Sequence, residues 1–126
     1  MKKGKIIPNG VLLEKHENET VLYFTRLGYE IELIPPSNCL GNKTPDFLMD
    51  GVAWEMKSPQ GKGKSSLEHT FKKAKKQSEN IIIDLQRSKM NEQDAIEEII
   101  KRFRQTKSCK RLKIITKNRE LLEFKK

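Results

Sequence analysis

Cysteine and histidine are scarce in this chain of 126 residues, which holds two of each. The cysteines, Cys39 and Cys109, lie far apart, and the histidines, His16 and His69, stand at unrelated spacings. A disulfide scaffold is therefore excluded, and a structural zinc site is disfavoured because its ligands come at regular spacings. A catalytic Cys-His pair is disfavoured as well, because it also needs a third orienting group.

Long apolar runs are missing too. No stretch approaches the roughly 18 residues of a membrane-spanning helix, and a proline and a glycine interrupt the N-terminal segment before any signal-like run develops. Aromatic residues make up 6% of the chain, with Trp54 as the one tryptophan, so no stacking platform for bases can be recognised. We expect a cytoplasmic protein with no membrane partner.

Acidic residues are outnumbered by basic ones. The chain has 17 Asp plus Glu against 26 Lys plus Arg, which gives a formal net charge of +9. A surplus of this size favours a polyanionic partner, most often nucleic acid, through neutralisation of phosphates. The alternative is that the charge serves solubility alone.

The length and the apolar content together predict one compact domain. Of all residues, 35% are hydrophobic and 34% charged, but the hydrophobic ones cluster in periodic blocks. A modest core is expected, and wholesale disorder is not. We assign residues 1–126 to a single domain, with residues 1–10 flexible.

The N-terminal half predicts a helix followed by a meander of strands. Apolar residues recur at helical spacing over residues 11–27, and residues 29–34 alternate like a strand. A loop over residues 35–43 then leads to two short strands, 47–49 and 52–57, which Asp50-Gly51 joins as a hairpin.

The C-terminal half predicts helices that alternate with strands. Residues 58–66 read as a mobile basic loop, 66–79 as an amphipathic helix with basic residues outside, and 80–85 as a strand buried on both faces. Asn91 caps a helix that runs to Gln105, and residues 112–116 and 121–124 form a closing strand or hairpin. The fold class is α/β, with an α-β-β-β-α-β core, an added helix and C-terminal strands.

The second hairpin strand carries the residues that suggest chemistry. Alternation places Glu55 and Lys57 on one face and Trp54 on the other, while Asp46 opens the paired strand after Pro45. Two carboxylates beside a lysine suit a Mg²⁺ site that acts on phosphate, where the metal lowers the pKa of a bound water and the lysine supports the transition state. The alternative is an exposed ion pair of little energetic value.

Two residues of the first helix lie near its apolar stripe. Glu17 falls among apolar residues and therefore needs a partner, either as a third acidic metal ligand or through an ion pair with a lysine. For His16, a packed, hydrogen-bonded imidazole is favoured over a catalytic one.

Basic residues outside this group are candidates for contact with a phosphate backbone. The glycine- and lysine-rich loop could surround phosphates, although it lacks the order of a nucleotide-binding P-loop, and the following helix adds a lysine stripe. The expected nucleic-acid-binding residues are Lys62, Lys64, Lys72, Lys76 and Arg87.

These motifs resemble a nuclease family. Thr44-Pro45-Asp46 followed by Glu55-Met56-Lys57 is similar to the PD-(D/E)XK motif of restriction-endonuclease-like nucleases, and the order of elements resembles their core. The resemblance implies that Asp46 and Glu55 bind a divalent metal, that Lys57 assists catalysis, and that Glu17 joins the metal site.

A narrower resemblance covers most of the chain from about Glu14. Three runs of residues, 45–51, 54–59 and 77–85, are similar to C-terminal toxin domains of contact-dependent inhibition proteins of the CdiA type. That resemblance implies a toxin that cuts tRNA or DNA, and an immunity protein as its partner.

Two other functions stay open. Some toxin domains cleave RNA without metal by acid-base chemistry, and in that case Lys57, His69, Ser78 and Arg87 would bind phosphate and move protons while the two acids position them. A non-catalytic nucleic-acid-binding module on the same core is the third possibility. We predict the first, a metal-dependent endonuclease.

Overall fold

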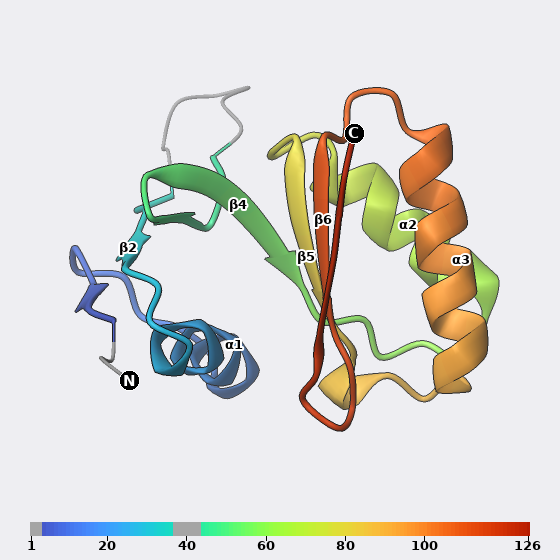
Figure 1. Ribbon diagram of the computed structural model, residues 1–126, viewed down its shortest axis with the longest axis horizontal. Coiled ribbons are helices and arrows are strands. Elements are labelled where there is room, and N and C mark those ends of the chain that lie inside the picture. Colours follow the sequence, from blue (N-terminus) through green and yellow to red (C-terminus); the bar gives the residue numbers. More distant parts are fainter. Residues whose placement is uncertain (1–3, 37–43) are drawn as a thin grey trace.

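The computed structural model describes residues 4–36 and 44–126 (Figure 1). Its strands are β1 (Ile6–Ile7), β2 (Ile31–Leu33), β3 (Phe47–Met49), β4 (Val52–Lys57), β5 (Asn80–Asp84), β6 (Arg111–Ile115) and β7 (Leu121–Lys125). Its helices are α1 (Lys15–Arg26), α2 (Lys64–Ala74) and α3 (Glu92–Gln105), with a short 3-10 turn, η1 (Leu85–Arg87), after β5.

The seven strands lie in the sheet in their chain order. Strands β2, β3 and β4 form an antiparallel meander, while β4, β5 and β6 run parallel and are joined by the crossover helices α2 and α3. Strand β1 pairs in parallel with β2, and β7 closes the sheet antiparallel to β6. The α/β class and the predicted α-β-β-β-α-β core are confirmed.

Strand β4 belongs to both halves of the sheet. Its first residues pair with β3, from Val52 to Trp54, and its last residues pair with β5, from Glu55 to Lys57. Figure 1 shows β4 curving from the α1 side of the molecule to the α2 and α3 side. Glu55 is therefore the first residue of β4 beyond the pairing with β3.

Two apolar clusters cover the two faces of the central strands. Ile81 and Ile83 of β5 pack with α2 and α3, whereas Ile82 packs with α1 and the meander. All five residues of β5 are buried, because helices cover one side and the curved meander covers the other. The predicted central strand buried on both faces is confirmed.

The hairpin between β3 and β4 has the predicted turn. Asp50 and Gly51 both adopt positive φ values, of 49° and 85°. A two-residue hairpin turn with two positive φ values matches the twist of the strands it joins, and Asp-Gly is the sequence that adopts it most readily. This turn fixes the register of β3 against β4.

Several predicted boundaries are wrong. Helix α1 begins at Lys15 instead of residue 11, because Glu14 and Glu17 form a capping box there. Helix α2 begins at Lys64, inside the stretch expected to be a loop, and it ends at Ala74 instead of 79, where the backbone turns and the Gln77 and Ser78 amides bond to Ala74 O.

The N-terminal segment expected to be flexible contains an ordered element. Residues 6–7 form β1, where Ile6 packs against the α1 cluster, and Gly4 N–H donates to Thr25 O. The prediction for the loop over residues 37–43, including Cys39, lies outside the described residues. In the described part of the chain, no helix is long and apolar enough to cross a membrane.

Candidate active site

Asp46 lies at the point where β4 leaves β3. Its backbone N–H donates to Trp54 O at 3.0 Å, one residue off the register in which Phe47 pairs with Trp54. Its carboxylate then accepts a hydrogen bond from the Met56 backbone N–H at 2.9 Å. The hairpin brings Asp46 close to Glu55, and both acids line one cavity. The predicted convergence of the two acids is therefore present.

Glu55 is a buried carboxylate with an incomplete set of partners. Its residue surface is 4% exposed, and Lys57 Nζ lies 3.1 Å from its Oε2. Its other oxygen, Oε1, is buried and has no hydrogen-bond donor. The alternative of an exposed ion pair is wrong for this residue, because β5 and the surrounding core exclude water from it. A buried acceptor without a donor is costly and suggests a missing positive partner.

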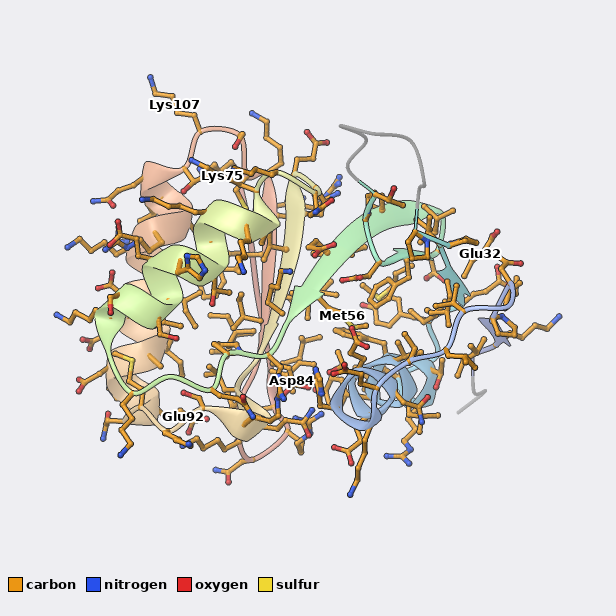
Figure 2. All side chains as sticks on the ribbon, turned by 180° about the vertical axis from the view of Figure 1, so that it is seen from behind. Glu32, Met56, Lys75, Asp84, Glu92 and Lys107 are labelled. Carbon is orange, nitrogen blue, oxygen red and sulfur yellow. The ribbon has the colours of Figure 1, made fainter. Side chains whose placement is uncertain are left out.

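The side chains next to Glu55 on β4 face the other way. Trp54 and Met56 pack into the cluster formed by α1 and the meander, as alternation along the strand predicts. Figure 2 shows Met56 and Asp84 in the region between α1 and the α2 and α3 layer. Core packing on this face therefore holds the backbone that carries Glu55 and Lys57.

Burial and like charge raise the pKa of both acids. Loss of solvent raises the pKa of Glu55 to about 8, and the negative charge of Asp46 adds to the rise, while Lys57 opposes it. Burial raises the pKa of Asp46 too, although its bond from Met56 N–H and its hydrogen bond with Glu55 oppose the rise. Two neighbouring carboxyl groups with raised pKa values resist joint ionisation.

A cavity of about 280 Å³ opens beside the acid pair. Asp46 and Glu55 line it together with Gln77, whose Oε1 is also buried without a hydrogen-bond donor. Oxygen acceptors thus outnumber donors here, which is the donor set that a hard divalent cation such as Mg²⁺ prefers. The residues present fit that group. The sequence analysis gave Gln77 no role in the site, although Gln77 begins the run 77–85, because it lies in a turn far from both acids along the chain.

The structure places Glu17 and His16 at the start of α1. Glu17 Oε1 accepts a hydrogen bond from Glu14 N–H at 3.0 Å, so its partner is a backbone amide and not a lysine. Its charge still acts on Asp46, whose pKa it raises. Among the described residues, no three His, Cys, Asp or Glu side chains gather as a metal-binding group, so Glu17 does not join the two acids. His16 is half-buried, with its Nδ1 3.6 Å from Glu14.

The expected nucleic-acid-binding residues differ in their exposure. Lys62, Lys64 and Lys76 are exposed, and Lys72 is exposed and paired with Glu68 at 3.6 Å. Arg87 is different, because it is half-buried and lies against Ser58 in a cleft next to Lys57. Of the residues named for metal-free chemistry, His69 lines the same cleft, whereas Ser78 donates a hydrogen bond to Ala53 O.

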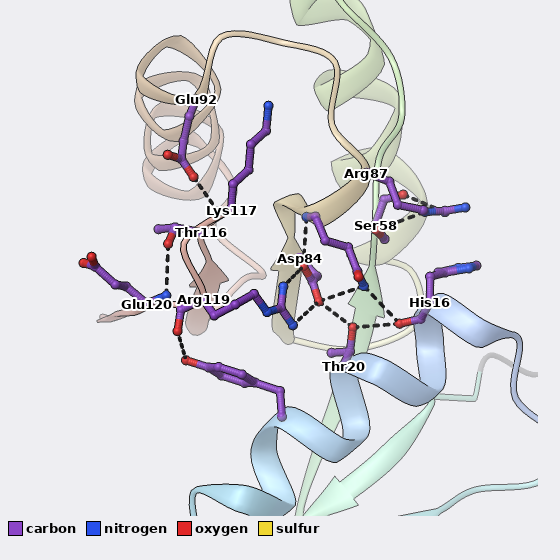
Figure 3. A network of polar contacts seen from close by, with 12 residues as sticks. His16, Thr20, Ser58, Asp84, Arg87, Glu92, Thr116, Lys117, Arg119 and Glu120 are labelled. Carbon is purple, nitrogen blue, oxygen red and sulfur yellow. Dashed lines mark hydrogen bonds and ion pairs between the residues drawn. The ribbon is translucent and has the colours of Figure 1, made fainter.

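A buried polar network at the end of β5 was not predicted (Figure 3). Asp84, at 1% exposure, accepts hydrogen bonds from Thr20 Oγ1 at 2.7 Å and from Arg119 Nη1 at 2.8 Å. Gln86 donates to Asp84 and, at 3.2 Å, to His16 O. The network connects α1, β5, η1 and the turn before β7. Its members lie far apart in the sequence, so no local pattern reveals them.

Comparison with known proteins places this arrangement in a family. The family model of the contact-dependent growth inhibition CdiA C-terminal domain matches residues 43–121, more than half of the chain. The chain belongs to this family. The match includes Asp46, Glu55 and Lys57, together with the cavity residue Gln77.

A solved structure shares the fold of this CdiA C-terminal domain. It is described as the CdiA-CT/CdiI toxin and immunity complex from Burkholderia pseudomallei, with a TM-score of 0.73 and 19% sequence identity. The similarity covers 98% of this chain and 100% of the other. A comparison with curated proteins gave no match.

Proposed function

We propose that this CdiA C-terminal domain is a toxin that hydrolyses phosphodiester bonds of nucleic acid, tRNA or DNA, with the help of a divalent cation. The proposal rests on the buried Glu55 carboxylate, which lines one cavity with Asp46, lies 3.1 Å from Lys57 and leaves one oxygen without a hydrogen-bond donor. Perturbed carboxyl groups in a pocket are typical of sites that act chemically.

The donor set supports Mg²⁺ as the cation, held by Asp46 and Glu55. Bound there, the ion would supply a Lewis acid for the phosphate and lower the pKa of water. The chain itself contributes two anchored carboxylates: Met56 N–H orients that of Asp46, and β5 pairing fixes the strand that carries Glu55. The Gln77 amide oxygen, which faces the same cavity, adds a neutral acceptor.

Lys57 provides a positive charge beside the acid pair. It is partly exposed, so its ammonium group can contact both Glu55 and a solvent-side phosphate oxygen. Charge on the phosphate oxygens increases during in-line attack, and a fixed ammonium group stabilises the transition state more than the ground state. The order of elements and the motif from Asp46 to Lys57 support the same assignment, since they resemble PD-(D/E)XK nucleases.

An immunity protein is the proposed protein partner. The structure of similar fold is described as a complex of a toxin with its immunity protein. The net charge of +9 independently supports nucleic acid as the substrate.

A cleavage assay tests the proposed function. Total tRNA and plasmid DNA are each incubated with the protein in Mg²⁺ and in EDTA, with Glu55→Gln as the test variant. Glu97→Gln on the exposed side of α3 is the matched control, because it removes the same charge far from the acid pair. Cutting that needs both Mg²⁺ and Glu55 supports the proposal.

Two outcomes would contradict it. RNA cutting that survives EDTA would favour the acid-base mechanism. Binding of nucleic acid without cutting under any condition would favour the non-catalytic module.

A further inference from the structure

A second cavity, of about 290 Å³, is lined by Lys57 but by neither Asp46 nor Glu55. Its walls come from the start of α1, the end of β4, α2 and η1. We call it the Lys57 cleft. Its positive side chains are Lys57, Lys73 and Arg87, and the imidazoles of His16 and His69 also line it.

The positive charges of the Lys57 cleft are largely without partners. Neither Arg87 nor Lys73 forms an ion pair with a carboxylate among residues 4–36 and 44–126. Glu17 is the one acidic residue in the lining, and its Oε1 is bonded to Glu14 N–H. The cleft therefore has a surplus of positive charge, which suits an anion.

Arg87 is held in place before any ligand arrives. Its Nε donates to Ser58 Oγ at 3.2 Å and its Nη2 to Ser58 O at 2.8 Å. A guanidinium group has five N–H donors, so these two bonds leave donors free for a ligand in a fixed, planar arrangement. A planar group of this kind can donate two parallel hydrogen bonds to the oxygens of one phosphate.

The walls around Arg87 are fixed as well. Gln86, its neighbour in η1, donates to both Asp84 and His16 O, which ties η1 to the start of α1. Asp84 also accepts from Thr20 of α1. Figure 3 shows His16 and Arg87 extending to the same side of this network. A binding group held in this way loses less entropy on binding its ligand.

We propose that the Lys57 cleft binds a backbone phosphate next to the one that is cut. Lys57 connects the two places, since it contacts Glu55 and lines the cleft. A nucleic acid carries phosphates at regular intervals, so one strand can present a phosphate to the acid pair and another to Arg87. This inference rests on the proposed nuclease function and specifies how the same site holds its substrate.

Salt-dependent binding tests the inference. A labelled single-stranded oligonucleotide, in RNA and in DNA form, is titrated with protein across a range of KCl concentrations, in a Glu55→Gln background that prevents cutting. Arg87→Gln is added to this background in one protein. Lys73→Gln is added in a second, because Lys73 is exposed and we expect its replacement to leave the fold intact. Arg104→Gln and Lys101→Gln on the exposed face of α3 are the matched controls.

We expect Arg87→Gln to lower the slope of log affinity against log salt by about 0.7 to 0.9, the effect of losing one phosphate contact. Lys73→Gln is expected to change the slope in the same direction, and the control variants are expected to leave it within error. Equal slopes for Arg87→Gln, Lys73→Gln and both controls would overturn the inference.

The results distinguish a failure of the phosphate-binding cleft from a failure of the proposed nuclease function. If the wild-type protein cuts no nucleic acid but Arg87→Gln still lowers the salt slope, the cleft stands and the nuclease proposal falls. If Glu55-dependent cutting is found and Arg87→Gln binds and cuts like Arg104→Gln in an otherwise wild-type chain, the nuclease stands and the cleft falls.

Discussion

Glu55 is costly to bury, but its position suits the proposed cation site. A carboxyl group is buried there beside a second one, and both have raised pKa values because burial and like charge disfavour their ionised forms. Folding would be easier with an apolar residue at this position. The arrangement becomes favourable when a cation balances the two charges.

The raised pKa of Glu55 makes stability depend on pH. In the folded state the pKa of Glu55 is about 8, whereas in the unfolded chain it has its ordinary value of 4.5. The free energy of unfolding therefore falls as pH rises between these values, by up to about 1.4 kcal/mol per pH unit. Urea denaturation at several pH values between 5 and 8, without metal, measures the fall.

Glu55→Gln is expected to lose this part of the pH dependence, because an amide does not titrate. Its stability should exceed that of the wild type at pH 8 and approach it at pH 5. Parallel curves for the two proteins across the whole range would show that Glu55 is already ionised when folded.

Asp84 is also a buried carboxylate, but unlike Glu55 it has a full set of hydrogen-bond partners. Thr20, Gln86 and Arg119 all donate to it. We expect Asp84→Asn to lower the free energy of unfolding by about 1 to 3 kcal/mol, because Arg119 then lacks a charge partner. Chemical denaturation measures the loss, with the exposed Glu120→Gln as the control. A change below about 0.5 kcal/mol would contradict this reading of the network.

At the scale of elements, the hairpin of β3 and β4 sets the geometry of the acid pair. Phe47 pairs with Trp54, and this register brings Asp46 close to Glu55, with which it lines one cavity. A shift by one residue would turn the side chains of β4 to the opposite faces. The turn is therefore part of the site, although it lies at some distance along the strands.

Gly51→Ala tests the part played by this turn. The backbone at Gly51 has φ of 85°, and an added Cβ would contact nothing within 4 Å, so the cost comes from the backbone alone. We expect a loss of about 1 kcal/mol in the free energy of unfolding. Gln60→Ala is the control, because Gln60 is exposed, lies outside the helices and strands, and is not among the residues with a positive φ. Equal thermal midpoints for the two variants would contradict the prediction.

The sequence predicted those elements whose signals are local. Asp50-Gly51 marked the hairpin, and the run from Ile81 to Ile83 marked the buried central strand. Strand β1 was missed because its two residues are ordered by pairing with β2, more than twenty positions away. The start of α1 was placed too early because glutamate is not among the usual capping residues.

For the candidate site, too, only the parts with a local sequence signal could be predicted. Asp46, Glu55 and Lys57 follow from a short motif with strand alternation. The convergence of the two acids needed the register, which only the folded hairpin gives. Gln77 and the Asp84 network were missed, because their partners come from segments distant in sequence. The Lys57 cleft was missed as a unit for the same reason, although Arg87 had been named.

At the scale of the whole molecule, β4 unites two differently packed halves. The meander with α1 covers one face of β5, and α2 with α3 covers the other. Both cavities lie along the second half of β4, one beside Asp46 and Glu55 and the other beside Lys57. A strand of nucleic acid laid along this region would meet the acid pair and the basic cleft in succession.

Binding of a divalent cation by the acid pair is tested by calorimetric titration of the metal-free protein with Mg²⁺ at pH 8 and at pH 6. We expect binding to wild type and to the control Glu97→Gln, weaker at pH 6 because Glu55 must then lose a proton. Glu55→Gln and Asp46→Asn should not bind. Equal binding by wild type and Glu55→Gln would contradict the account.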